Sequence, residues 1–175
     1  MALPMPHPSP VPLAKGHDLT AFDCGTPALN DYLSKHALQN QQNRSARTYV
    51  TVLENRVVGY YTLVAGSVSR EDVPPRVAKG LGNYPVPIIL LARLAVDQKE
   101  QGQGLGASLL KDALLRSAQA SDIVGCRAVL VHAKNQTAQA FYRKFGLEPS
   151  PVDDLHLYVL VKDIRANFRD SPKQA

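Results

Sequence analysis

The sequence contains no tryptophan, two cysteines and two methionines. Arginine or lysine breaks its apolar runs well short of the ~20 residues that a transmembrane helix needs, which excludes a membrane span. Cys24 and Cys126 lie far apart without a CxxC pair, so a disulfide framework or a metal centre is disfavoured. The N-terminal residues lack the basic segment and apolar core of a secretory signal. We therefore expect a cytoplasmic protein without a bound metal.

Acidic residues are missing from two stretches, 32–53 and 73–96, of a chain with a net charge of +5 and a pI of about 9.3. Basic stretches without acids suit a polyanionic partner, such as a nucleic acid or an acidic protein. An ordinary solvated basic face gives the same pattern, so charge alone does not choose between them. The basic residues of the two stretches are Lys35, Arg44, Arg47, Arg76, Lys79 and Arg93.

The composition, with 45% apolar and 20% charged residues among 175, suits one globular domain over 1–175. A proline-rich lead-in over 1–16 and a polar tail over 164–175 flank an alternation of helices and strands, which predicts a mixed α/β fold. A strand, a helix and a second strand over 88–133 predict a right-handed βαβ unit with parallel strands. The expected helices are 27–41, 105–118 and 135–145, and the expected strands are 11–15, 46–53, 57–68, 88–96, 126–133 and 155–162.

A glycine-rich turn, Gln101-Gly102-Gln103-Gly104-Leu105-Gly106, follows an apolar strand and opens an amphipathic helix. Glycines let backbone N–H groups approach a ligand, and a helix start adds unpaired N–H donors, which suits a phosphate or pyrophosphate. A P-loop needs a lysine after the glycines, where Ala107-Ser108 stand. A dinucleotide-binding motif needs an acid at the end of the next strand, which reads Val131-His132-Ala133-Lys134.

The pattern Gln101-x-x-Gly104-x-Gly106 resembles the Q/R-x-x-G-x-G/A motif of the GNAT acyltransferases, and other family features occur in order around it. The resemblance covers residues 46–162. It implies the GNAT fold, a central mixed sheet with splayed parallel strands and flanking helices, and acetyl-coenzyme A (acetyl-CoA) as cofactor. The other matching stretches are Leu94-Ala95-Val96, His132-Ala133, Asn135-x-x-Ala138 and Ala140-Phe141-Tyr142-x-x-x-Gly146-Leu147.

The resemblance also implies how acetyl-CoA would be held. Its pantetheine arm would pair with backbone groups as an added strand, and a backbone N–H near Val96 would polarise the thioester carbonyl. Asn135 would hydrogen-bond the arm, although it also fits a helix N-cap. The pyrophosphate would lie on the N–H groups of Gln101, Gly102, Gln103, Gly104, Leu105 and Gly106, and the arm along Leu94, Ala95 and Val96.

Tyr142 stands where the family has a tyrosine that protonates the leaving thiolate. A core aromatic with a structural role is the alternative. The sequence indicates no nucleophilic cysteine or serine, so we expect direct attack by the acceptor amine. A general base is not evident. His132 and His36 are candidates, although an esterified amino acid has an amine less basic than a free α-amine of pKa ~8 and scarcely needs one.

Phe22-Asp23-Cys24-Gly25 and Leu29-Asn30-Asp31-Tyr32-Leu33 resemble the opening segment of the GNAT toxins of type II toxin–antitoxin systems. The stretches 59–63 and 91–97 also resemble that group. The resemblance implies acetylation of the α-amine of aminoacyl-tRNA, which blocks translation, with the six basic residues on RNA and Arg93 near the mouth of the active site. It further implies a homodimer and a ribbon-helix-helix antitoxin through which the complex binds DNA.

Two other functions remain open at this point. One is a GNAT enzyme that acetylates a small amine or a protein N-terminus, although such enzymes often carry acids near the acceptor site. The other is a non-catalytic acyl-CoA-binding module, which would not require Tyr142.

Overall fold

The computed structural model describes residues 6–168. It contains two compact units, of which unit 1 comprises residues 1–64 and 92–113, and unit 2 comprises residues 65–91 and 114–175. Two strands and one helix begin in one unit and end in the other. The expected organisation as a single GNAT domain stays a prediction.

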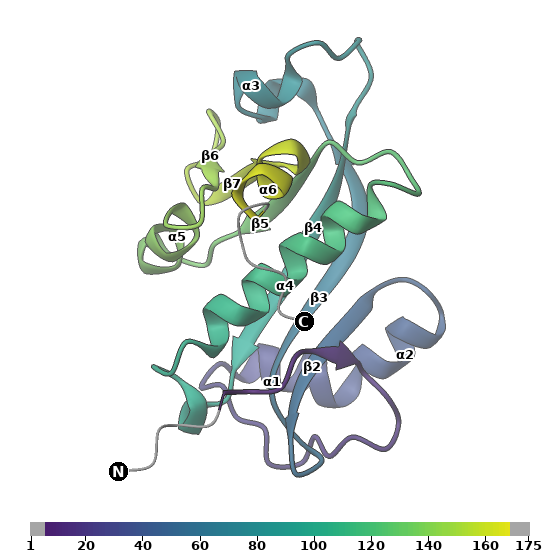
Figure 1. Cartoon of the computed structure of the whole chain (residues 1–175), viewed down its shortest axis with the longest axis vertical. Helices are drawn as coiled ribbons and strands as arrows, with labels where there is room; N and C mark the ends of the chain where they lie inside the picture. The colour runs from purple at the N-terminus through teal and green to yellow at the C-terminus, as the bar shows by residue number, and fades with distance from the viewer. Residues whose placement is uncertain (1–5, 169–175) are drawn as a thin grey trace. The chain divides into compact units, whose positions relative to one another are not determined.

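Seven strands form one mixed sheet in the order β1-β2-β3-β4-β5-β7-β6 (Figure 1). Strands β4 and β5 pair in parallel, which confirms the parallel pair expected from the sequence. The pairs β1–β2, β2–β3, β5–β7 and β6–β7 are antiparallel. The expected mixed sheet is therefore confirmed. The strands are β1 (Val11–Pro12), β2 (Arg47–Leu53), β3 (Arg56–Val68), β4 (Val86–Val96), β5 (Ala128–His132), β6 (Glu148–Pro149) and β7 (His156–Leu160).

The described helices flank this sheet, and none is long and apolar enough to span a membrane. The residues from 6 to 168 also contain no group of three or more histidine, cysteine, aspartate or glutamate side chains placed to hold a metal ion. The helices are α1 (Pro27–Lys35), α2 (Ala37–Gln42), α3 (Pro75–Ala78), α4 (Leu105–Ala120), α5 (Gln136–Arg143) and α6 (Val161–Phe168), with short 3₁₀ turns η1 (Arg70–Asp72) and η2 (Gln98–Glu100).

Unit 1 is built on the β2–β3 hairpin. Its turn residues Glu54 and Asn55 have φ angles of 49° and 66°, the left-handed conformation that two-residue hairpin turns require. One face of the hairpin packs against helices α1 and α2. The core on that face is aliphatic and aromatic, and its buried members include Phe22, Leu33, Val50 and Tyr60.

The helix expected over 27–41 is divided into α1 and α2 at His36, where the backbone leaves the helical region with φ −126°. After this division, α2 lies against strand β2. The Gln41 side chain donates to the Leu13 carbonyl at 2.6 Å and accepts from the Thr48 N–H at 3.0 Å. These two bonds tie α2 to the lead-in and to β2, and a pattern based on helical spacing does not reveal them.

Unit 2 is built on β5 and β7, which pair antiparallel over five residues, and helix α3 covers part of one face. The Arg127 guanidinium donates to the Val77 carbonyl at 2.9 Å and to the Lys79 carbonyl at 3.0 Å, so it caps the end of α3. The Arg76 guanidinium pairs with Glu148 and Asp163 at 2.7 and 3.1 Å. Two arginines therefore fix α3 to the rest of this unit.

Two expectations for the C-terminal part were wrong. The strand expected to run to Lys162 ends at Leu160, and helix α6 replaces the first part of the expected polar tail. Val161 and Ile164 are buried one helical turn apart, which provides the packing that stabilises α6. A short strand that was not expected, β6, pairs with β7. The remainder of the expected tail, 169–175, lies outside the described residues.

Candidate active site

The glycine turn joins the end of β4 to the start of α4 in unit 1. Gly102 and Gly104 have φ angles of +79° and +85°, which side chains with a Cβ rarely adopt. The Gly104 carbonyl accepts from the Ser108 N–H at 3.1 Å, so the helical hydrogen bonds start there. The N–H groups of the first turn that follows have no acceptor within the helix. The turn thus presents backbone donors at a helix N-terminus.

The polar side chains of the turn hold its shape. Gln101 donates from Nε2 to the Val96 carbonyl at 2.9 Å and to the Cys24 carbonyl at 3.3 Å. Asp97 is buried and accepts from the Lys99 N–H at 2.9 Å and the Asp23 N–H at 3.1 Å. The turn is therefore fixed by bonds to both β4 and the segment before α1.

The backbone at the two glycines is uncovered. A Cβ built on Gly102 or on Gly104 would meet no atom within 4 Å, so both positions are open. Because the backbone is fixed and the glycines are uncovered, an anion can approach the N–H groups closely. This observation makes the turn suitable for the pyrophosphate of acetyl-CoA.

The pairing of the parallel strands ends before β4 does. The β4–β5 pairing runs from Ile88 and Ala128 to Leu91 and Val131, whereas β4 itself continues to Val96. Backbone groups of 94–96 therefore lie beyond the last residue pair with β5. A ligand with amide groups can use such a segment as a strand partner.

Asn135 and Tyr142 lie at the two ends of helix α5 in unit 2. Asn135 is the N-cap, and its Oδ1 accepts from the Ala138 N–H at 2.9 Å. The capping role considered from the sequence is therefore confirmed, and the side-chain NH₂ group takes no part in it. Tyr142 is only 9% exposed and lies edge-on to Phe141, with ring centroids 5.2 Å apart.

Burial raises the pKa of Tyr142 to about 12. The phenol is thus protonated at neutral pH, as a proton donor must be. The side chain that the sequence placed as a general acid has the required protonation state, buried at the end of a helix.

Three comparisons with known proteins bear on this site. The family model described as "Acetyltransferase (GNAT) domain" matches residues 44–149. The chain is 50% identical, over 93% of its length and 97% of the relative's, to the tRNA-acetylating toxin of Mycobacterium tuberculosis (strain ATCC 25618 / H37Rv). The chain belongs to the GNAT acetyltransferase family.

Solved structures of AtaT resemble this fold over most of the chain. AtaT complexed with acetyl-methionyl-tRNAfMet superposes with a TM-score of 0.84 at 32% identity and covers 91% of this chain and 98% of that one. A Tyr-to-Phe mutant of AtaT bound to acetyl-CoA and the C-terminus of the antitoxin AtaR gives a TM-score of 0.78 at 32% identity, with 92% and 97% covered. The expected GNAT fold is confirmed.

Arg93 in this GNAT chain is held by an aromatic ring. Its guanidinium carbon lies 3.6 Å from the Tyr32 ring centroid, and Tyr32 stacks on Tyr60 at 6.5 Å. The contact that the structure shows for this guanidinium is therefore a cation–π one. No local pattern predicts this contact, because Tyr32 and Arg93 lie far apart in the sequence.

The other basic residues differ in their surroundings. In unit 1, Lys35 pairs with Asp31 at 3.1 Å on α1, Arg47 lies 6.0 Å from the Tyr49 ring centroid, and Arg44 is exposed. In unit 2, Lys79 is exposed, whereas the charge of Arg76 is shared between two carboxylates. Arg76 is therefore the weakest candidate of the six for a nucleic-acid contact.

The two histidines considered as bases also differ. His36 is exposed and lies beside Tyr32, with ring centroids 6.3 Å apart. His132 ends strand β5 and stacks on His156, with centroids 4.0 Å apart. Desolvation, together with the charge of His156, lowers the pKa of His132, while Asp153 opposes this effect. Sequence reasoning treated His132 as a single residue and missed the pair.

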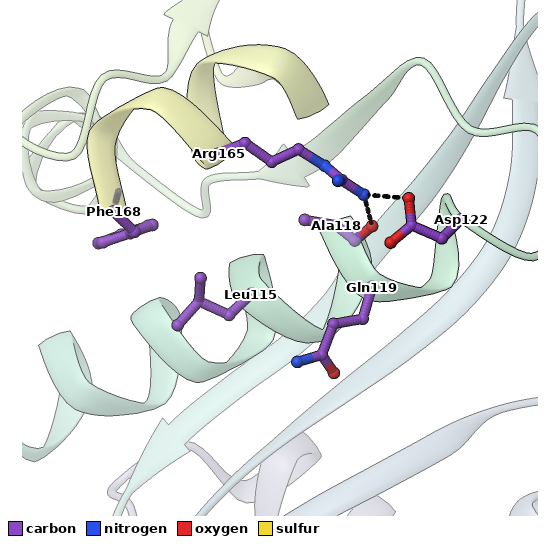
Figure 2. A pocket seen from close by; sticks show the side chains of 6 residues that line it. All are labelled: Leu115, Ala118, Gln119, Asp122, Arg165 and Phe168. Carbon is purple, nitrogen blue, oxygen red and sulfur yellow. Dashed lines mark hydrogen bonds and ion pairs between the residues drawn. The ribbon is translucent and has the colours of Figure 1, made fainter. Parts of the chain in front are cut away.

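A hollow of about 330 Å³ lies away from the glycine turn, between the C-terminal half of α4 and helix α6 (Figure 2). Arg165 crosses its rim and donates to the Ala118 carbonyl at 2.8 Å and to Asp122 at 2.5 Å. Leu115 and Phe168 line its apolar side. The hollow is formed where α6 docks on α4, and no sequence-predicted site residue lines it.

Proposed function

We propose that this protein is the toxin of a toxin–antitoxin system and acetylates the α-amine of the amino acid on charged tRNA, which blocks translation. The observation that carries the proposal is the similarity to a tRNA-acetylating toxin, with 50% of residues identical over 93% of this chain. The AtaT complex with acetyl-methionyl-tRNAfMet supports the same acceptor. Acetyl-CoA is the proposed donor.

The donor would bind along unit 1 at two groups of backbone atoms. The N–H groups of 101–106 would hold its pyrophosphate, and those of 94–96 would pair with the pantetheine amides. The side-chain NH₂ of Asn135 would provide a further hydrogen bond. When bound, the donor supplies an acetyl group activated as a thioester.

Tyr142 is the proposed general acid. Its phenol is neutral at physiological pH and would protonate the sulfur that leaves as the amine attacks. A backbone N–H near Val96 would hydrogen-bond the carbonyl oxygen as negative charge develops there. The tyrosine that is replaced by phenylalanine in the AtaT structure with acetyl-CoA supports a role for a tyrosine in this family.

The acceptor tRNA would be held by positive charge. Arg93, pre-oriented on Tyr32, would bind next to the reacting amine, and the exposed cations would contact phosphates farther along the acceptor stem. The residues proposed for these phosphate contacts are Lys35, Arg44, Arg47 and Lys79. Arg76 is the weakest candidate, because two carboxylates share its charge.

The proposed partners follow from the toxin function. An antitoxin of the ribbon-helix-helix class would neutralise the protein, and the complex would bind DNA through the antitoxin. The active form would be a homodimer, located in the cytoplasm with its tRNA substrate.

Incubation with labelled acetyl-CoA and total aminoacylated tRNA tests the proposal. Label should appear in the RNA fraction and be released as N-acetyl amino acid after mild alkaline hydrolysis of the ester. Deacylated tRNA is the control and should stay unlabelled. Label on a polyamine or a peptide, with none on any aminoacyl-tRNA, would overturn the toxin assignment and favour a GNAT enzyme for small amines or protein N-termini.

A further inference from the structure

We propose that His132 accepts the proton that the acceptor amine loses, and that His156 and Asp153 position and tune it. The proposal rests on the proposed function, because it concerns the same acyl transfer. It gives the reaction the general base that the sequence left open.

His132 lies at the place in unit 2 where a ligand is expected. It is the last residue of β5 and follows Val131, which makes the final parallel pair with β4. Ligands of α/β sheets bind beyond the carboxyl ends of parallel strands. The chain then continues directly to Asn135 and to α5, which carries Tyr142. His132 is therefore the last residue of the strand that leads, within unit 2, to the helix that carries Tyr142.

A second histidine fixes the ring of the first. His132 and His156 are a directly opposed pair of β5 and β7, and their rings are nearly parallel, with an interplanar angle of 16°. The Nε2 of His156 lies 3.5 Å from the Asp153 carboxylate. Stacking restricts the orientation of the His132 ring, and the residue remains exposed.

The neighbours of His132 keep it ready to accept a proton. Partial burial and the positive charge that His156 can carry both disfavour the imidazolium form, and the Asp153 carboxylate favours it. The net effect is a pKa below the usual 6.5. His132 is therefore neutral at pH 7 and can act as a base, whereas a histidine with a raised pKa would already be protonated.

The proton balance of the step is complete. The amine nitrogen forms a bond to the acetyl carbon while the bond from that carbon to sulfur breaks. One N–H proton passes from the nitrogen to His132, and the sulfur takes a proton from Tyr142. After product release, water returns a proton to the tyrosine and removes one from the histidine.

His36 is the alternative base, and its surroundings differ. It lies at the break between α1 and α2 in unit 1, beside Tyr32, and no carboxylate hydrogen-bonds to its ring in the part of the chain that the structure describes. His36→Gln is therefore a matched control for His132→Gln.

The first test is the pH profile of kcat/KM on aminoacyl-tRNA. In the wild type the rate should fall at acid pH, below 6.5. His132→Gln should lower kcat/KM at pH 7 by about 10²-fold, the lower end of the range for a general base. In this variant the fall of kcat/KM at acid pH that is due to protonation of His132 should disappear. Added imidazole should restore part of the rate. His36→Gln should keep the wild-type profile.

The second test reads the pKa of His132 without turnover, from the ring resonances of the free protein in an NMR titration. His156→Phe keeps a stacked ring but removes the neighbouring charge, so the pKa should rise. Asp153→Asn removes the opposing carboxylate, so the pKa should fall. The acid limb of kcat/KM should move in the same direction in each variant.

The outcomes separate the two proposals. No acetylation of aminoacyl-tRNA by the wild type would remove the proposed function. Acetylation by the wild type, with an unchanged pH profile and unchanged rate in His132→Gln, would overturn the role of His132 alone. A third outcome would also overturn the proposal for His132. In it, His132→Gln lowers the rate, imidazole does not restore it, and the acid limb of kcat/KM stays in place in His156→Phe and Asp153→Asn. His132 would then have a structural role.

Discussion

The guanidinium carbon of Arg93 lies over the Tyr32 ring, 3.6 Å from its centroid, and the Tyr32 ring in turn stacks on that of Tyr60. A cation held by its face keeps the N–H groups at its edge for another partner. The stack fixes the direction of a positive charge in unit 1 at the strand that would bind the donor. This arrangement is the strongest sign of an acceptor site in that unit.

Arg93→Ala should raise the KM for aminoacyl-tRNA roughly tenfold or more, because a hydrogen bond to a charged group is worth about 1.5–3 kcal/mol. Arg93→Lys keeps the charge but loses the stacked plane and should recover little. Tyr32→Phe keeps the ring and should match the wild type. Steady-state kinetics with one purified aminoacyl-tRNA decides the point, and a wild-type KM in Arg93→Ala would remove Arg93 from the acceptor site.

Tyr142→Phe should lower kcat by about 10²-fold, because the leaving sulfur loses its proton donor. The KM for acetyl-CoA should not change, since the hydroxyl is not part of the proposed cradle. Because burial raises the pKa of Tyr142 to about 12, this group should cause no loss of wild-type activity up to pH 10. Tyr158→Phe is the control, as it removes the hydroxyl of another buried tyrosine in unit 2. Equal kcat values in the two variants would refute the assignment.

Regular patterns in the sequence predicted most elements. Three of these patterns depend only on residues close by in the sequence: the apolar run before the glycine turn, the Asn135 cap and the helical spacing after it. The structure has the expected strand and helix at these residues. The same patterns predicted the parallel pair of β4 and β5, whereas the central mixed sheet was what the family resemblance implied. Such local signals survive because tertiary packing reinforces them.

Features that depend on distant partners could not be predicted. Helix α6 was missed because charged residues separate Val161 from Ile164, and the buried face is recognised only once α4 is in place beside it. The contact of Arg93 with Tyr32 and the stack of His132 on His156 each join separate stretches. Strand register and side-chain direction create these pairs, and a single sequence states neither.

Arg76 and Lys79 should behave differently although both lie in the same basic stretch. Arg76→Ala breaks the pairs with Glu148 and Asp163, so it should lower the melting temperature in a thermal unfolding scan. Lys79→Ala should leave that temperature unchanged but reduce the slope of log Kd for tRNA against log salt by about 0.7–0.9, the value for one phosphate contact. An unchanged salt slope in Lys79→Ala would remove this lysine from the RNA interface.

Gly104→Ala should weaken the donor site through the backbone alone. A Cβ at this position meets no atom, but a φ of +85° costs a residue other than glycine about 1–2 kcal/mol. The turn would relax and its N–H groups would move off the pyrophosphate, so the KM for acetyl-CoA should rise about tenfold. Gly80→Ala is the matched control, because Gly80 has a φ of +81° and equally open surroundings but lies in the loop before β4. Both variants should lose similar stability, and only Gly104→Ala should lose affinity in a titration with CoA. Equal affinities would show that the turn does not bind the donor.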